Sequence, residues 1–233
     1  MVTFVPEYCH MERKIITTSD GSKSLYLPQW DETYHSRHGA IREAFHVFIR
    51  HGLDRFEDGA ELGILEIGFG TGLNALITLI EAGRRNLKIR YRGLEAYPVT
   101  EEILGELDYP ASLGREDLTP LFRRLHESPW EEELEITSGF RLVKQKVLFS
   151  EYSAKGEFDL VYFDAFGPRV QPDLWTIEIF NSMHQALRPG GTLVTYSAKG
   201  SVRRAMQEVG FLVERLPGPP GKREMLRATK QVE

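Results

Sequence analysis

The feature that most constrains the fold is a glycine-rich turn within residues 64–74, Ile-Leu-Glu-Ile-Gly-Phe-Gly-Thr-Gly-Leu-Asn. An apolar run breaks into three alternating glycines, after which apolar residues recur at the spacing of one helix face, at Leu73, Leu76, Ile77 and Ile80. Strand, glycine turn and helix in this order bring the backbone of an open α/β sheet close to a nucleotide. Glycine has no Cβ, so such a turn is tight and leaves space for a ligand. The alternative is an ordinary βα turn without a ligand.

The spacing of the glycines narrows the class of ligand. Gly68, Gly70 and Gly72 form G-x-G-x-G, whereas the dinucleotide fingerprint requires a glycine where Leu73 stands. With Glu66 inside the strand end, the segment resembles motif I of the class I S-adenosylmethionine-dependent methyltransferases. That resemblance implies S-adenosyl-L-methionine as the cofactor.

Length and composition are those of an ordinary globular protein. The chain has 233 residues, which suits one α/β domain with a modest extension, and 41% of them are hydrophobic. No run of 18 apolar residues predicts a membrane span, and the N-terminus lacks the pattern of a signal peptide. The single Cys9 has no partner for an internal disulfide and is interpreted as incidental. Together these features predict a cytoplasmic protein without a membrane association.

The first 52 residues are predicted to form a small extension. Asp20-Gly21 stands between two β-prone runs and predicts a hairpin over residues 13–27. A helix is expected from about Ile41, with Gly52 placed to cap its C-terminus. We therefore interpret residues 1–52 as a hairpin and helix extension packed on a methyltransferase domain of residues 53–233.

Strands and helices then alternate, which is typical of a parallel sheet covered on both faces. Strands are expected at residues 62–68, 88–96, 140–149, 158–163 and 192–197. Helices are expected at residues 72–82, closed by Gly83, and at 99–107, 118–126, 176–187 and 201–209. The acidic run 131–133 is interpreted as a solvated loop or face, and residues 188–191 as a turn. The last two strands, 211–216 and 225–229, predict an antiparallel pair at one edge of a Rossmann-like, mostly parallel sheet.

Three carboxylates, those of Glu66, Glu95 and Asp164, fall near the carboxyl ends of predicted strands, where open α/β sheets bind ligands. Glu95 ends the second strand and is suited to accept hydrogen bonds from the ribose hydroxyls of an adenosine, although it is also compatible with a surface acid at a turn. Asp164 follows a buried strand, so its carboxylate either has a catalytic role or caps the following loop. Phe166 is suited to stack on a flat base or to belong to the core.

Other catalytic chemistries find little support in the sequence. The seven histidines show no metal-binding spacing, and His35 and His38 lack an evident third ligand. No G-x-S-x-G elbow is present. We therefore expect no metal site and no serine nucleophile.

The final quarter of the chain is basic within an acidic protein. Residues 199–230 hold eight basic and three acidic side chains, a local charge of +5 in a chain of −5. One interpretation is a patch that contacts phosphates. The other is a solvated helix face beside an edge strand.

Taken together, these segments resemble the methyltransferase domain of MnmC, the bifunctional protein of 5-methylaminomethyl-2-thiouridine biosynthesis in tRNA. Beside the glycine turn, the most specific matching segments are Tyr34-His35-Ser36, residues 162–168 (Tyr-Phe-Asp-Ala-Phe-Gly-Pro), residues 172–176 (Pro-Asp-Leu-Trp-Thr) and residues 221–226 (Gly-Lys-Arg-Glu-Met-Leu). The resemblance implies methyl transfer to the exocyclic amine of 5-aminomethyl-(2-thio)uridine at the tRNA wobble position. The implied partner is a tRNA anticodon stem-loop. The chain ends at Glu233 without a second glycine fingerprint, so we expect no flavin domain.

The resemblance also assigns expected roles to residues. Asp164 would orient the amine and accept its proton. The expected cofactor-binding residues are Tyr34, Ser36, Glu66, Gly68, Gly70, Gly72, Asn74 and Glu95. The expected tRNA-binding residues are Phe166, Arg203, Arg204, Lys222 and Arg223. Two alternatives stay open: an aminopropyltransferase-like enzyme acting on a small amine, and a non-catalytic module that binds a cofactor or RNA.

Overall fold

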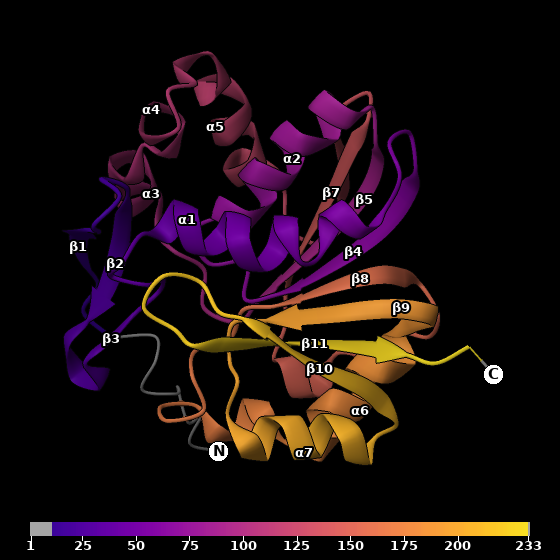
Figure 1. The fold of residues 1–233 in the computed structure, drawn as a ribbon. Helices are drawn as coiled ribbons and strands as arrows, with labels where there is room; N and C mark the ends of the chain where they lie inside the picture. Colours follow the sequence, from indigo (N-terminus) through magenta and orange to yellow (C-terminus); the bar gives the residue numbers. More distant parts are fainter. Residues whose placement is uncertain (1–10, 233) are drawn as a thin grey trace, which may run out of the picture.

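The computed structural model describes residues 11–232, so Cys9 lies outside the described part. An eight-stranded sheet has the order β10-β11-β9-β8-β4-β5-β7-β6 (Figure 1). The strands are β4 (Glu61–Ile67), β5 (Lys88–Glu95), β6 (Glu133–Thr137), β7 (Phe140–Lys146), β8 (Phe158–Phe163), β9 (Leu187–Thr195), β10 (Phe211–Pro217) and β11 (Glu224–Lys230). The five central strands, in the order β9-β8-β4-β5-β7, pair parallel to one another. At one edge β6 pairs antiparallel with β7, and at the other β11 pairs antiparallel with both β9 and β10. The predicted Rossmann-like sheet with an antiparallel edge is therefore confirmed.

Both faces of this sheet are covered, because alternate side chains of the central strands enter different cores. In β8, Leu160 and Tyr162 pack under one layer of helices and Val161 and Phe163 under the other. The first layer contains α1 (Ala40–Ala44), its π-helical continuation (Phe45–Arg50), α2 (Leu73–Arg85) and α5 (Thr119–Glu127), with α3 (Glu101–Leu107) and α4 (Tyr109–Ser112) nearby. The second layer contains α6 (Ile177–Ala186) and α7 (Gly200–Glu208). No helix within residues 11–232 has the length and apolar character that crossing a membrane requires.

The N-terminal hairpin is confirmed, and it also caps a helix. Strands β1 (Lys14–Thr17), β2 (Lys23–Leu27) and β3 (Glu32–Thr33) form an antiparallel sheet of their own beside the main one. The Asp20 carboxylate in the turn accepts a hydrogen bond from the Arg42 amide at 3.0 Å, and the Thr18 hydroxyl accepts one from the Ala40 amide at 3.3 Å. These bonds satisfy the first free N–H groups of α1, which has no cap from its own preceding residue.

Two predicted helix caps are wrong. Gly83 lies inside α2, which instead ends at Asn86 in the left-handed conformation, with φ of 52°. Gly52 has φ of −110° and so is not a left-handed cap. Close packing explains this glycine, since a Cβ there would lie 2.5 Å from the Phe48 carbonyl oxygen.

Residues 188–191, predicted as a turn, lie within β9, whose pairing with β8 shifts in register between Phe158 and Leu160. The acidic run 131–133 is solvent-exposed as predicted, and its last residue, Glu133, begins the edge strand β6. The predicted strand 140–149 ends earlier, at Lys146, and is followed by a short 3₁₀ turn, Phe149–Glu151. The other turns of this kind are Pro28–Trp30, Leu53–Arg55, Glu116–Leu118 and Pro172–Trp175.

Candidate active site

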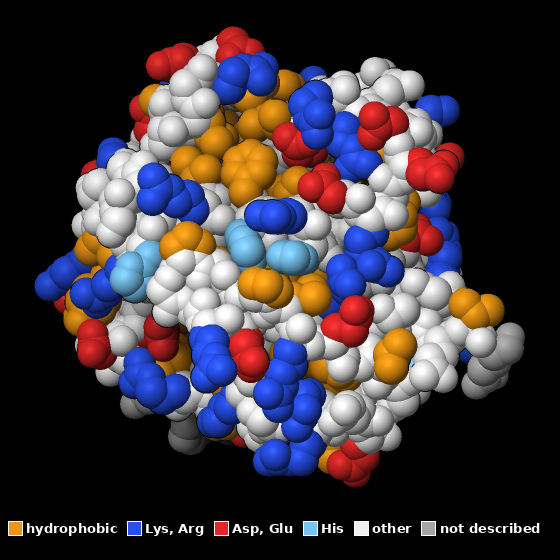
Figure 2. All heavy atoms as spheres, in the orientation of Figure 1, with side chains coloured by type: hydrophobic (Ala, Val, Ile, Leu, Met, Phe, Trp, Pro, Cys, Tyr) orange, Lys and Arg blue, Asp and Glu red, His pale blue; other side chains and the backbone are white. Residues whose placement is uncertain are grey.

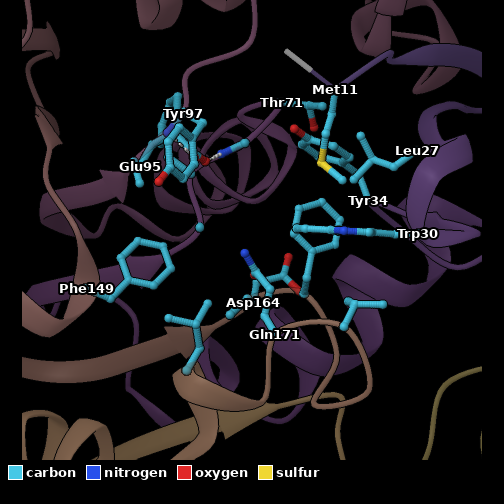
Figure 3. A pocket seen from close by; sticks show the side chains of 18 of the residues that line it. Met11, Leu27, Trp30, Tyr34, Thr71, Glu95, Tyr97, Phe149, Asp164 and Gln171 are labelled. Carbon is cyan, nitrogen blue, oxygen red and sulfur yellow. Dashed lines mark hydrogen bonds between the residues drawn. The ribbon is translucent and has the colours of Figure 1, made fainter. Parts of the chain in front are cut away.

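A cavity of about 200 Å³ opens at the carboxyl ends of β4, β5 and β8 (Figure 3). Four segments line it, namely the glycine turn after β4, residues 95–97 after β5, residues 148–149 after β7 and residues 164–174 after β8. The N-terminal extension closes the remaining side with residues such as Met11, Trp30 and Tyr34. The position is the one expected for a ligand in an open α/β sheet.

The three glycines of the turn all have positive φ, and each has a separate steric reason. A Cβ on Gly68 would lie 2.8 Å from the Asp164 carbonyl oxygen, because the loops after β4 and β8 touch there. A Cβ on Gly70 would reach the Tyr34 ring at 3.4 Å. A Cβ on Gly72 would lie 2.8 Å from His126 Nε2. Side chains at the first two positions would intrude on the cradle that the turn forms along the cavity.

Backbone amides hold Glu95 in place at one end of the cavity. Its Oε2 accepts a hydrogen bond from the Gly70 amide at 2.9 Å, and its Oε1 accepts one from the Tyr97 amide at 2.9 Å. Arg13 of the extension donates to the carbonyl oxygens of Tyr97 and Pro98, at 2.8 and 3.0 Å. Each carboxylate oxygen has a second lone pair, so Glu95 remains able to accept further hydrogen bonds from a ligand.

A polar chain connects Asp164 to the core. The Asn74 side-chain amide donates to Asp164 Oδ2 at 2.8 Å and to Glu66 Oε1 at 2.9 Å, and the Tyr91 hydroxyl donates to Glu66 Oε2 at 2.8 Å. Glu66 is fully buried, and this burial raises its pKa well above the usual range. The chain fixes the side-chain conformation of Asp164, because both hydrogens of the Asn74 amide are used to bridge the two carboxyl groups.

The pKa of Asp164 is raised to about 7, chiefly because burial disfavours its charged form, with Glu43 adding to the rise. The hydrogen bond from Asn74 and the charge of Lys222 act in the opposite direction. Lys222 Nζ lies 2.6 Å from Glu43 Oε1 and 3.8 Å from the centroid of the Tyr196 ring. Asp164 therefore exchanges its proton near neutral pH, as a catalytic base must.

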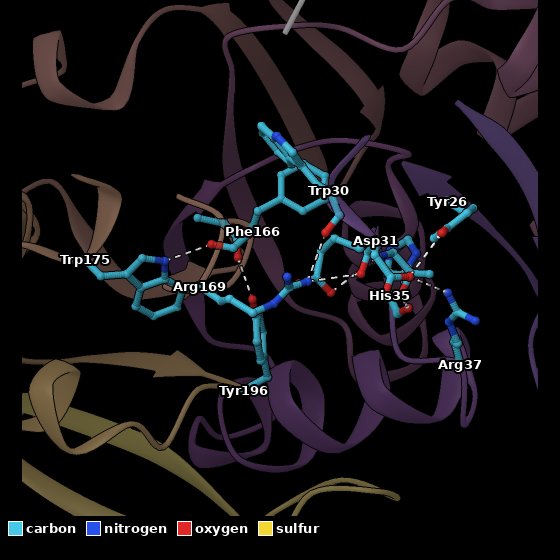
Figure 4. A network of polar contacts seen from close by, with 12 residues as sticks. Tyr26, Trp30, Asp31, His35, Arg37, Phe166, Arg169, Trp175 and Tyr196 are labelled. Atoms are coloured by element: carbon cyan, nitrogen blue, oxygen red, sulfur yellow. Dashed lines mark hydrogen bonds and ion pairs between the residues drawn. The ribbon is translucent and has the colours of Figure 1, made fainter. Parts of the chain in front are cut away.

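Aromatic rings form the wall beyond Asp164. Phe166 contacts Trp30 and Tyr34 edge to face, with centroid distances of 5.4 and 4.9 Å. Arg169 joins this loop to the extension, since its guanidinium donates to the carbonyl oxygens of Trp30 and Asp31, both at 3.1 Å (Figure 4). The wall thus offers a flat apolar surface, and the hydrogen bonds of Arg169 fix the loop after β8 to the N-terminal extension.

The structure brings most of the predicted site residues together. Those that line the cavity are Tyr34, Gly68, Gly70, Asn74, Glu95, Asp164 and Phe166. Glu66 does not reach the cavity but accepts a hydrogen bond from Asn74, which does. Gly72 precedes the first residue of α2 and faces His126 of α5. The Ser36 amide instead donates to Glu43 Oε2 at 2.7 Å, so this residue organises the neighbouring wall.

The predicted basic residues divide into two groups. Arg204 on α7 and Arg223 in the β10–β11 loop are exposed, and Figure 2 shows Lys and Arg side chains gathered over this region with acidic ones between them. Arg203 is partly buried, and Lys222 is held by Glu43. Only the exposed pair is free to meet a phosphate without rearrangement.

Sequence reasoning missed several residues of the site. Arg13, Trp30 and Gln171 line the cavity but lie in segments without a motif. Gly93, inside β5, was a weaker sequence signal of the close contact between this strand and the glycine turn, since a Cβ on it would lie 2.4 Å from the Phe69 ring. A glycine inside a strand often marks such a close approach.

A family described as S-adenosyl-L-methionine-dependent methyltransferase matches residues 122–231. The bifunctional tRNA 5-methylaminomethyl-2-thiouridine biosynthesis protein MnmC of Cupriavidus metallidurans is 34% identical over 227 residues, which are 90% of this chain. The crystal structure of MNMC2 from Aquifex aeolicus matches with a TM-score of 0.75 and 26% identity, covering 98% of this chain and 73% of that one. Over most of its length the chain is similar to the methyltransferase part of MnmC and to MNMC2.

The chain spans about a third of the length of its curated relatives, since the alignment covers 33% of the Cupriavidus metallidurans protein. A spermidine synthase from Thermotoga maritima also shares the fold, with a TM-score of 0.52 and 16% identity over 96% of this chain. At that identity the likeness concerns the fold alone. The matched family model is that of an S-adenosyl-L-methionine-dependent methyltransferase, which confirms the predicted cofactor, S-adenosyl-L-methionine.

Proposed function

We propose that this protein transfers a methyl group from S-adenosyl-L-methionine to the exocyclic amine of 5-aminomethyl-(2-thio)uridine at the wobble position of tRNA. The product is 5-methylaminomethyl-(2-thio)uridine. The observation that carries the proposal is Asp164, which lies at the end of β8 in the same cavity as the glycine turn and exchanges its proton near pH 7. The similarity to MnmC and MNMC2 supports the choice of substrate.

The cofactor fits the end of the cavity formed by the glycine turn. Gly68 and Gly70 line the cavity with bare backbone, which a cofactor can approach closely, and Glu95 offers lone pairs to the two ribose hydroxyls. Tyr34 packs against Gly70 and covers this end from the extension. S-adenosyl-L-methionine supplies an electrophilic methyl group, whose bond to sulfur breaks as the amine nitrogen forms its new bond to carbon.

Asp164 acts on the amine. The nitrogen needs a free lone pair, so the substrate must react as a neutral amine rather than as an ammonium ion. The Asp164 carboxylate accepts a hydrogen bond from the amine N–H and takes the proton that nitrogen loses as the new bond forms. Asn74 holds the carboxylate in one orientation through its 2.8 Å hydrogen bond. Alignment of the amine nitrogen with the methyl carbon and the sulfur contributes at most about 7–11 kcal/mol to lowering the reaction barrier.

The tRNA would approach from the side of the exposed arginines. Arg204 and Arg223 are suited to contact phosphates, and the aromatic wall with Phe166 suits an unstacked base. Single-stranded loops are the usual targets of base-specific RNA recognition, and an anticodon loop is one of them.

Nucleoside analysis after reaction tests the proposal directly. The protein is incubated with labelled S-adenosyl-L-methionine and tRNA that carries 5-aminomethyl-2-thiouridine, and the digested nucleosides are separated. We expect label in 5-methylaminomethyl-2-thiouridine and none with tRNA whose wobble uridine is unmodified. Label in another nucleoside, or none at all, would refute the assignment.

An aminopropyltransferase-like activity is the competing function, and the shared fold with spermidine synthase is its only support. Decarboxylated S-adenosylmethionine with free putrescine separates the two. We expect no spermidine from this reaction under conditions where the tRNA is methylated.

A further inference from the structure

The end of the cavity near Asp164 contains a second polar side chain, that of Gln171 (Figure 3). The two residues belong to one folded loop, because the amides of Val170 and Gln171 both donate to the Gly167 carbonyl oxygen, at 3.0 and 3.1 Å. Gln171 then precedes the 3₁₀ turn Pro172–Trp175. This bend directs its side chain into the cavity rather than along the surface.

The loop around Gln171 is firmly held. The Tyr196 hydroxyl donates to the Ala165 carbonyl oxygen at 2.8 Å, and the Trp175 indole donates to the Phe166 carbonyl oxygen at 2.8 Å (Figure 4). Arg169 ties the loop to the N-terminal extension. A side chain on such a loop is positioned before any ligand arrives, which is what specific recognition requires.

Among residues 11–232, no partner hydrogen-bonds to the Gln171 carboxamide, whereas Asp164 Oδ2 in the same cavity accepts a hydrogen bond from Asn74. Gln171 therefore presents one N–H donor side and one carbonyl acceptor to the cavity that Asp164 also lines. A ligand that fits this pair has an acceptor and a donor next to each other on one flat edge.

We propose that Gln171 recognises the imide edge of the uracil ring, with its amide donating to O4 and its carbonyl accepting from N3–H. The inference rests on the proposed function and names the residue that recognises the substrate base. The reactive amine is attached through C5, the carbon next to C4. C5 lies between C4 and C6, so a base whose amine reaches Asp164 turns either O4 followed by N3–H, or C6–H, toward a side chain on the cavity wall. Only the first of these edges matches a carboxamide. The rings of Trp30 and Phe166 supply the apolar surface for the face of the base.

A double-mutant cycle between protein and RNA tests this contact. The substrates are synthetic anticodon stem-loops with 5-aminomethyluridine, with and without a methyl group on N3. Gln171→Met keeps the length of the side chain and removes both hydrogen bonds, whereas Gln171→Glu keeps the acceptor for N3–H. Gln207→Met, at an exposed position on α7, is the matched control.

For the wild type and Gln207→Met, we expect methylation of N3 to lower kcat/KM by roughly 10- to 100-fold, the usual worth of a bidentate contact to a base. Gln171→Met should be impaired to a similar degree on the unmodified ring and should lose no more than about twofold further on the N3-methylated one. Gln171→Glu should remain sensitive to N3-methylation. Unchanged binding of S-adenosylhomocysteine by calorimetry would show that the variants are folded.

The outcomes separate the two levels of the hypothesis. If Gln171→Met and the wild type lose activity by the same factor on N3-methylation, Gln171 does not contact N3–H and the inference is wrong, while the proposed function stands. If the wild type methylates neither RNA but binds S-adenosylhomocysteine, the proposed function fails and the inference fails with it.

Discussion

At the scale of single residues, the pKa of the Asp164 carboxyl group is set by neighbours that act in opposite directions. Burial and Glu43 raise its pKa, while the hydrogen bond from Asn74 and the charge of Lys222 lower it. The result, about 7, differs from the 3.8 of an ordinary aspartate. A base of this strength is half ionised at neutral pH and accepts a proton more readily than a typical carboxylate.

This balance predicts how activity depends on pH. Only the ionised carboxylate accepts a proton, so kcat/KM should fall as the pH drops through about 7. Asp164→Asn should lower kcat by roughly 10²- to 10⁴-fold and remove this limb of the profile, because the amide cannot act as a base. Affinity for S-adenosylhomocysteine, measured by calorimetry, should change little. A variant with near wild-type kcat would exclude Asp164 as the base.

Lys222 provides a second test at this scale. Its ammonium pairs with the buried Glu43 and lowers the pKa of Asp164, so Lys222→Met should move the acidic limb of the pH–rate profile to higher pH. The substitution should also destabilise the fold by about 1–3 kcal/mol, since Glu43 loses its partner. Lys155→Met, at an exposed position, is the control for loss of one charge. An equal shift in both variants would exclude a specific effect of Lys222.

At the scale of elements, the sequence predicted the strands and helices whose patterns are strong. The apolar run of β8, the glycine turn after β4 and the Asp20-Gly21 hairpin all have signals that are local in sequence. Strand β6 was missed because its five residues, Glu-Leu-Glu-Ile-Thr, follow an acidic run and alternate with charge. Charged edge strands protect a sheet from pairing with other chains, and they look like loops in sequence.

The site was predictable to the same extent. Glu95 ends β5 and Asp164 directly follows β8, so their place at the carboxyl edge of the sheet followed from topology. The contacts of Trp30 with Phe166 and Arg169, and that of Glu43 with Lys222, depend on how the extension and the β10–β11 loop fold over that edge. These contacts join residues more than a hundred positions apart, and no periodicity in the sequence encodes them.

The capping of α1 by the hairpin predicts a coupling between the two elements. Asp20→Ala removes the acceptor for the Arg42 amide and should lower the free energy of unfolding by about 1 kcal/mol, within the 0.5–2 kcal/mol range of such caps. Chemical denaturation of the variant measures this cost. Glu208→Ala, at an exposed position on α7, should change stability little. A wild-type value for Asp20→Ala would show that the hairpin does not support the helix.

At the scale of the whole molecule, the basic charge of residues 199–230 is only partly available. Arg227 pairs with Glu214 at 2.9 Å, and Lys230 donates to the carbonyl oxygens of His184 and Leu187. Arg204 and Arg223 remain exposed on the face shown in Figure 2. Lys222, Arg227 and Lys230 are therefore held within the fold, whereas Lys199, Arg204, Arg215 and Arg223 lie exposed.

This division predicts the salt dependence of tRNA binding. Reversing two of the exposed charges, with Arg204→Glu and Arg223→Glu, should raise KM for tRNA and reduce the slope of log KM against log salt by about 0.7–0.9 for each lost phosphate contact. Lys88→Glu with Lys155→Glu changes the same charge at the other end of the sheet and should leave the slope unaltered. Equal slopes for the two double variants would remove Arg204 and Arg223 from the RNA-binding surface.

The position of β11 has a consequence for how the protein is made. Although it comes last among the strands, β11 lies between β10 and β9, and the loop before it carries Lys222 to the wall beside Asp164. A nascent chain that has emerged only to β10 leaves β9 with an open edge, because β10 joins the sheet only through β11. The sheet is thus completed only when residues 224–230 have left the ribosome. The glycine turn is synthesised about 150 residues earlier, so during this interval it belongs to a domain whose sheet is still incomplete.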